Sequence, residues 1–139
     1  MPKKRAVFGW GILLLLLIAA GYGYHLYNKP RQSAGEQSVQ VTISADSLFS
    51  AYQRDEQGSD KKYLGKVIEV SGTVSSVQHS GQSEIWILST SSSMGGGINC
   101  QMYPGQKLTT PKAGDKVTIK GKCTGYLMDV NLADCAVSE

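Results

Sequence analysis

The chain has 139 residues, enough for one domain of common size and a shorter appendage. Its net charge of +3 is misleading, because five of its fourteen basic residues lie before residue 32. From residue 32 onward nine basic residues stand against eleven acidic ones, and this balance of −2 argues against a domain that binds nucleic acid or another polyanion.

Residues 6–27 are predicted to form a transmembrane helix. This segment of 22 residues has no Asp, Glu, Lys or Arg and contains five consecutive leucines. A helix of that length spans about 33 Å, enough for a hydrocarbon core of about 30 Å. Three basic residues precede the segment and only Lys29 and Arg31 follow it closely. This asymmetry predicts a single-pass anchor in the inner membrane, with residues 1–5 in the cytoplasm and the remainder periplasmic or extracellular.

A cleaved signal peptide is the alternative for the same segment. Ala19-Ala20-Gly21 offers the small residues that a signal peptidase requires, and the basic start fits such a leader. The apolar stretch nevertheless continues through Tyr27, which favours an uncleaved anchor. No cysteine lies near the end of the segment, so it lacks the lipid-attachment residue of a bacterial lipoprotein.

Residues 28–38 are polar and are predicted to be a linker, followed by a domain over residues 39–139. Alternating apolar residues over 39–43 suggest a short strand. Ser44 is the expected N-cap of a helix over about residues 45–57, because an apolar stripe of Leu48, Phe49 and Tyr52 follows it at helical spacing.

After Tyr63 the apolar period changes to two, which predicts a barrel of five strands within residues 63–138. The first strand contains Gly72 and changes phase at Ser75-Ser76, as expected of a bent or bulged strand. Five short strands with one long bent member favour a closed five-stranded OB-fold barrel. The gap from Tyr103 to Asp115 is long enough for a short helix.

Three segments carry a family resemblance: Lys62–Val74, Gly114–Tyr126 and Val130–Cys135. They resemble the tRNA_anti-like family of bacterial OB-fold proteins, and the helix ending in Tyr27–Arg31 is similar to that of membrane-anchored members common among Bacteroidetes. The resemblance covers nearly the whole chain and implies an OB-fold. It implies no catalytic or binding residues, because the shared motifs describe strands and turns.

The three cysteines suggest a disulfide, since thiols outside the cytoplasm tend to oxidise. If the last two strands form a hairpin centred near Asp129, then Cys123 and Cys135 face each other and are predicted to pair, with Cys100 free. Three reduced, buried cysteines are the alternative. No metal or other cofactor is expected, because there is no Cys-x-x-Cys and the chain has two histidines.

The predicted ligand-binding surface follows from the fold, because OB-folds bind ligands on the face of their second and third strands and the adjoining loops. Aromatic residues there would stack on bases or sugars, unless Trp86 packs into the core. The candidate residues are His79, Trp86, Tyr103, Tyr126 and Lys120.

The sequence therefore predicts a non-catalytic, membrane-tethered OB-fold binding module of the cell envelope, with an envelope protein or a saccharide as partner. A protein that binds single-stranded nucleic acid is the alternative, and it requires lysines of residues 107–122 to line the aromatic face. A hydrolase would need converging titratable groups, and no Gly-x-Ser-x-Gly or phosphate-binding motif indicates one.

Overall fold

The computed structural model describes residues 3–138 and divides the chain into two compact units, residues 1–31 and 32–139. The first unit is the helix α1 (Lys3–Tyr27). Within α1, residues Gly9–Tyr27 have a mean hydropathy of 1.5 and none of this stretch is buried. It is the one helix in the described part of the chain that is long and apolar enough to cross a membrane, although a signal sequence has the same properties.

The second unit begins with a short 3-10 turn, η1 (Ala34–Glu36), which lies inside the predicted linker. The Oγ of Ser33 caps this turn by accepting a hydrogen bond from the backbone N–H of Gly35 at 3.2 Å. Ala34 is fully buried, and a Cβ on Gly35 would lie 2.9 Å from the Cβ of Ala136 near the C-terminus. The second half of the predicted linker is therefore packed on the domain.

Helix α2 (Ala45–Arg54) begins where the sequence predicts it. The Oγ of Ser44 accepts a hydrogen bond from the backbone N–H of Ser47 at 3.2 Å, which satisfies one of the free donors at the helix start. The predicted apolar stripe faces the core and consists of Leu48, Phe49 and Tyr52.

A second helix, α3 (Glu56–Tyr63), follows where the sequence predicted only the end of the first. The Asp55 side chain caps it by accepting a hydrogen bond from the backbone N–H of Gly58 at 2.9 Å. Apolar periodicity does not reveal α3, because only Ser59 and Tyr63 of its eight residues are buried.

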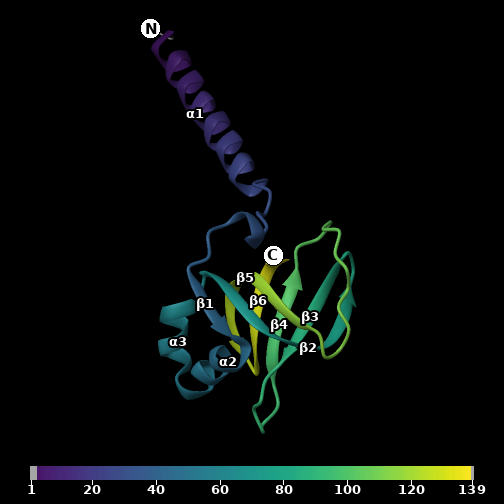
Figure 1. The fold of residues 1–139 in the computed structure, drawn as a ribbon. Helices are drawn as coiled ribbons and strands as arrows, with labels where there is room; N and C mark the ends of the chain where they lie inside the picture. The colour runs from purple at the N-terminus through teal and green to yellow at the C-terminus, as the bar shows by residue number, and fades with distance from the viewer. Residues whose placement is uncertain (1–2, 139) are drawn as a thin grey trace. The chain divides into compact units, whose positions relative to one another are not determined.

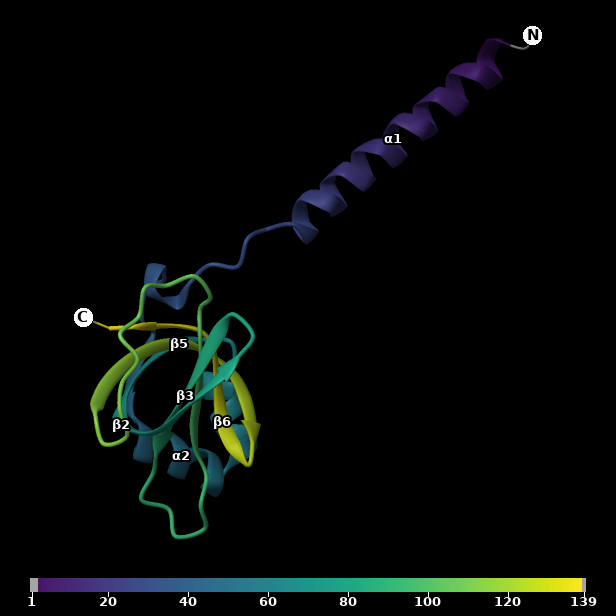
Figure 2. The same ribbon diagram turned by 90° about the vertical axis from the view of Figure 1, so that its right-hand side faces the viewer.

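Six strands make one sheet in the order β1-β2-β3-β4-β6-β5, and a further pairing of β2 with β5 closes it into a ring. Figure 2 shows the closed ring, and Figure 1 shows α2 and α3 beside it. In the barrel of the described residues, two pairs join strands that are far apart in the sequence: the antiparallel pair β2–β5 and the parallel pair β4–β6. The predicted five-stranded OB-fold barrel, β2 to β6, is confirmed. The strands are β1 (Val41–Ser44), β2 (Val67–Ser80), β3 (Ser83–Ser89), β4 (Gly97–Met102), β5 (Lys116–Leu127) and β6 (Asp129–Val137).

Strand β2 bends so that it serves two sides of the barrel. Residues 67–73 pair with β5 and residues 73–80 pair with β3. The register shifts between Val74 and Ser76, at the phase change seen in the sequence. A Cβ on Gly72 would lie 2.9 Å from the Cβ of Ala45, so a glycine here lets α2 start directly against the strand.

The predicted helix between Tyr103 and Asp115 is absent: this segment is an irregular loop. It contains two prolines, and Leu108 is its only apolar residue larger than alanine, so it has no helical face to bury. The barrel end is instead covered by α2, which precedes the barrel in the chain.

Candidate ligand-binding surface

The outer face of β3 and β4 is the usual binding face of an OB-fold, and here it carries amides. Cross-strand pairing aligns Ile85 with Gln101, Ile87 with Asn99, and Asn99 with Asn131 on β6. Paired residues share a face of the sheet, so these side chains form two adjacent rows that point away from the core. Neither row contains an aromatic or basic residue.

Trp86 lies on the opposite, inner face of β3. It is 2% exposed and belongs to the hydrophobic core, which is the alternative that the sequence left open for it. Its indole Nε1 donates a hydrogen bond to Oε2 of Glu84 at 2.8 Å, so the one polar atom of the ring is satisfied. In this position the indole offers no stacking surface to a ligand.

Glu84 lies at the end of the barrel that carries the β2–β3 turn. Its side chain contacts residues of β2, of β3 and of the loop before β5. Its Oε1 accepts a hydrogen bond from Thr110 Oγ1 at 2.9 Å and lies 3.8 Å from Nδ1 of His79. The hydrogen bond from Trp86 holds the pKa of Glu84 below its ordinary value of 4.5, with smaller contributions from Thr110 and His79, against an opposing effect of burial. His79 itself is 73% exposed.

Tyr126 lies at the other end of the barrel, against α2. Its ring stacks on Tyr52 with centroids 5.4 Å apart and meets Phe49 edge-on at 6.0 Å. Tyr103 follows β4, and its backbone N–H donates a hydrogen bond to the carbonyl of Cys135 at 2.9 Å. The aromatic candidates therefore belong to different ends of the barrel and do not form one platform.

The lysines of β5 share one face, as their sequence parity indicates. Cross-strand pairing places Lys120 opposite Glu69 and Lys116 opposite Thr73. In the ring of strands β5 neighbours only β2 and β6, so this basic row lies across the barrel from β3 and β4. Lys120 is consequently separated from the amide face and from Trp86.

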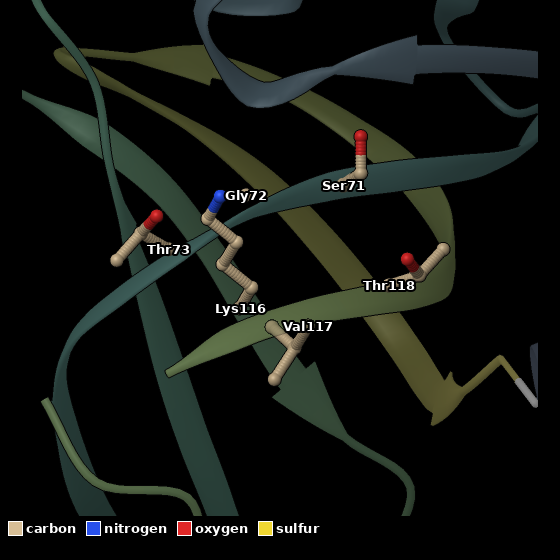
Figure 3. A pocket seen from close by; sticks show the side chains of 6 residues that line it. All are labelled: Ser71, Gly72, Thr73, Lys116, Val117 and Thr118. Carbon is tan, nitrogen blue, oxygen red and sulfur yellow. The ribbon is translucent and has the colours of Figure 1, made fainter. Parts of the chain in front are cut away.

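The outer face of β5 and the adjoining part of β2 are called the basic wall below. This wall contains a shallow concavity of about 360 Å³ (Figure 3). Hydroxyl groups of Ser71, Thr73 and Thr118 surround it, together with the side chains of Lys116 and Val117. The lining has hydroxyls and an ammonium group but no histidine or carboxylate.

The predicted Cys123–Cys135 disulfide is wrong in this structure, where all three cysteines are free and buried. Cys123 pairs with Leu132, because the hairpin turns at Met128, where Leu127 pairs with Asp129, and its register shifts once between this turn and Cys123. Cys135 instead lies opposite Met102 and hydrogen-bonds with Cys100. Burial, followed by this contact with Cys100, raises the pKa of the Cys135 thiol and keeps it protonated.

Cys123 has a different polar partner, the phenol of Tyr52. Its Sγ lies 3.3 Å from the Tyr52 hydroxyl, and both side chains are 1% exposed. Burial raises the pKa of Tyr52, and Cys123 and Asp60 add to the effect. The described residues contain no group of three or more His, Cys, Asp or Glu side chains that could hold a metal ion.

The structure also reveals exposed apolar residues that the sequence analysis did not select. Met94 precedes the glycines of the β3–β4 loop, and Leu127 and Met128 form the turn between β5 and β6. The sequence signal was present: apolar residues occupy a turn where Gly, Asn or Asp is usual.

These features define the class of the chain: an OB-fold domain behind an N-terminal apolar helix. The chain belongs to the tRNA_anti-like family, whose model matches residues 3–137. No curated protein sequence matches the chain.

Two solved structures are similar to it. A proposed nucleic acid-binding lipoprotein from Klebsiella pneumoniae subsp. pneumoniae MGH 78578 superposes with a TM-score of 0.56 at 16% identity, covering 80% of this chain and 100% of that one. A proposed aspartyl-tRNA synthetase from Leishmania major Friedlin has a TM-score of 0.47 at 9% identity, covering 85% of this chain and 25% of the other. At these identities the first likeness supports the fold alone.

Proposed function

We propose that this protein is a non-catalytic, membrane-tethered binding module of the cell envelope, and that its ligand is a saccharide rather than a nucleic acid. The observation that supports this most directly is the amide face of β3 and β4. Gln101 is exposed, and its amide offers both donors and an acceptor, which suits the hydroxyl and acetamido groups of sugars. Beside it the half-buried amides of Asn99 and Asn131 hydrogen-bond to each other at 3.4 Å and to Asp129, and so form a fixed polar row.

The charge distribution supports the same proposal. A nucleic acid gains most of its affinity from phosphates neutralised by lysine and arginine. The amide rows contain no basic residue, and Lys116 and Lys120 belong to the opposite wall. A neutral ligand requires no such neutralisation.

Titration of the full chain in lipid nanodiscs with a neutral N-acetylated tetrasaccharide tests the ligand. We expect shifts of the Asn99 and Gln101 side-chain NH₂ signals, and about fivefold to tenfold weaker binding for Asn99→Ala, the loss of one or two hydrogen bonds. Thr118→Ala on the opposite wall is the matched control and should bind normally. Equal weakening by both variants, or no shift with the sugar, contradicts the proposal.

Tethering is tested separately by adding protease to spheroplasts. An anchored domain outside the cytoplasm should be digested while residues 1–5 stay protected, because the longer basic flank precedes the helix. Release of intact domain with the periplasmic fraction would identify α1 as a cleaved signal sequence.

A single-stranded nucleic acid is the second candidate ligand. It is favoured by the description of the Klebsiella relative and by the lysine row on β5. The same titration with an oligonucleotide distinguishes it, because Lys120→Glu would then weaken binding and Asn99→Ala would not.

A further inference from the structure

One tip of the barrel exposes large apolar side chains to solvent. Met94 is 88% exposed, Leu127 is 82% and Met128 is 81%. Among the described residues from 32 onward, the other exposed large apolar side chains, Leu64 and Val137, reach only 49% and 41%. The three residues Met94, Leu127 and Met128 are called the apolar tip below.

Two residues of the apolar tip, Met94 and Met128, line a concavity of about 280 Å³ between α2, the β3–β4 loop and the β5–β6 turn, and Leu127 lies next to Met128. Phe49, which is 1% exposed, and Tyr126 supply aromatic walls, while Met94 and Met128 line it from the two loops. This volume is just below the range of about 300–1,000 Å³ typical of pockets that enclose small molecules. It is suited to a single large side chain.

The backbone under the apolar tip is held firmly. A Cβ on Gly96 would collide with the Phe49 ring and lie 3.0 Å from the Met128 carbonyl oxygen, so only glycine lets the loop approach so closely. Oδ1 of Asp129 accepts a hydrogen bond from the Gly97 N–H at 2.7 Å, which joins the loop to the hairpin.

The backbone of Met128 has a conformation that is unfavourable for methionine. Its φ is +65°, in the left-handed region where Gly or Asn is the relaxed choice. A methionine here adds strain and exposes apolar surface, so folding gives no reason for it. Methionine side chains are adaptable and polarisable, and they are over-used on surfaces that bind varied apolar partners.

The charge that lines the concavity indicates which kind of partner can bind there. Asp129 is the one charged residue among the eight that line the concavity. No lysine or arginine lines it. The surface therefore repels anions and complements a cation next to an apolar group.

Within the domain, the apolar tip lies at the end of the barrel opposite to η1. Met128 precedes β6, whereas η1 packs on Ala136 near the end of β6. A strand of nine residues is about 30 Å long. Figure 1 shows the β3–β4 loop and the C-terminus at opposite ends of the barrel.

We propose that the apolar tip is a docking site for a protein partner, which inserts one large apolar side chain flanked by lysine or arginine between Met94 and Met128. This site adjoins the amide face, because Asp129 lines the concavity and its Oδ2 accepts a hydrogen bond from Nδ2 of Asn99 at 3.4 Å, but the proposal does not depend on the ligand bound at that face.

Methionine-methyl NMR of the full chain in nanodiscs tests the proposal with the defined peptide acetyl-Gly-Lys-Phe-Lys-Gly-amide. We expect the Met94 and Met128 methyl signals to shift and the signal of Met102, which is 1% exposed in the core, to stay unchanged. Replacing both lysines of the peptide by glutamate should weaken binding about tenfold, as should Met128→Asn, whose new residue tolerates the left-handed backbone.

The proposal is contradicted if the peptide causes no shift at Met94 and Met128, or if the lysine and glutamate peptides bind equally well. Broadening of both signals by gadolinium lipids in the nanodisc would show contact with the bilayer instead. Concentration-dependent shifts without peptide would show that a second copy of the chain covers the apolar tip.

Discussion

The two ends of the barrel are closed by different chemistry. At the helix end, Phe49, Tyr52 and Tyr126 pack their rings together under α2. At the loop end, Trp86 is held by a carboxylate, Glu84, which also accepts a hydrogen bond from the loop residue Thr110. We therefore expect the stability of the helix end to depend on apolar packing, and that of the loop end to depend on the ionised Glu84 side chain and thus on pH.

The largest expected effect is at the helix end. Phe49→Ala should lower the free energy of unfolding by about 3–5 kcal/mol, because it removes a buried ring from a packed cluster. Urea unfolding followed by Trp86 fluorescence, in a Trp10→Phe background, measures this. Gln53→Ala, on the exposed side of α2, is the control and should change stability by less than about 0.5 kcal/mol. A loss below about 1 kcal/mol for Phe49→Ala would contradict the role of the rings.

A smaller loss is expected at the loop end. Trp86→Phe keeps an aromatic ring but removes the donor to Glu84, and should cost about 1–3 kcal/mol. Unfolding followed by circular dichroism measures the loss. If Trp86→Phe leaves the free energy of unfolding unchanged, the hydrogen bond from the indole to Glu84 does not stabilise the loop end.

The loop end should also be the pH-sensitive end. The pKa of Glu84 is lower in the folded protein than its ordinary value of 4.5, so this group stabilises the fold above that value. The contribution is lost as the pH falls from 4.5 toward the folded pKa. The urea midpoint of unfolding should fall less between neutral and acidic pH for Glu84→Gln than for the natural chain. Identical pH profiles would exclude the carboxylate as the cause.

The smallest expected effect is again at the helix end. Tyr52→Phe removes the hydroxyl that contacts Cys123 and leaves the stacked ring in place, so we expect a loss of about 0.5–1.5 kcal/mol. Tyr126→Phe is a matched control on the other stacked ring and should be nearly neutral. Equal effects of the two variants would mean that the contact with Cys123 contributes nothing specific.

The sequence predicted the barrel because its strands alternate between apolar and polar residues, apart from local phase changes, and because most of its turns carry glycine. The bend of β2 at Ser75-Ser76 and the N-cap at Ser44 were visible for the same local reasons. The pairing of the β5–β6 hairpin was not. The slip between Leu132 and Cys135 is visible in the apolar pattern, where Asp134 has φ +53°, but the pattern does not say which residues of β5 lie opposite. The turn at Met128 and the register shift next to Cys123 set Leu132 opposite Cys123, and so the predicted disulfide with Cys135 is not supported.

The candidate site was harder to predict than the fold. Parity within β3 separates Trp86 from Ile85 and Ile87 but does not say which set faces the core. The tertiary pairing decides this: it buries the indole, exposes Gln101 and leaves Asn99 half-buried. The sequence could likewise place Lys120 on one face of β5 but could not place that face across the barrel from β3.

Fluorescence anisotropy with a labelled single-stranded oligonucleotide tests most directly the claim that the barrel does not present a nucleic-acid surface. The full chain in nanodiscs, at an ionic strength of about 150 mM, should show no saturable binding up to about 100 μM, the weak end of non-specific affinities. Binding with a dissociation constant of about 1–10 μM that Lys116→Glu and Lys120→Glu both weaken would contradict the account and make the basic wall of β5 the ligand-binding surface.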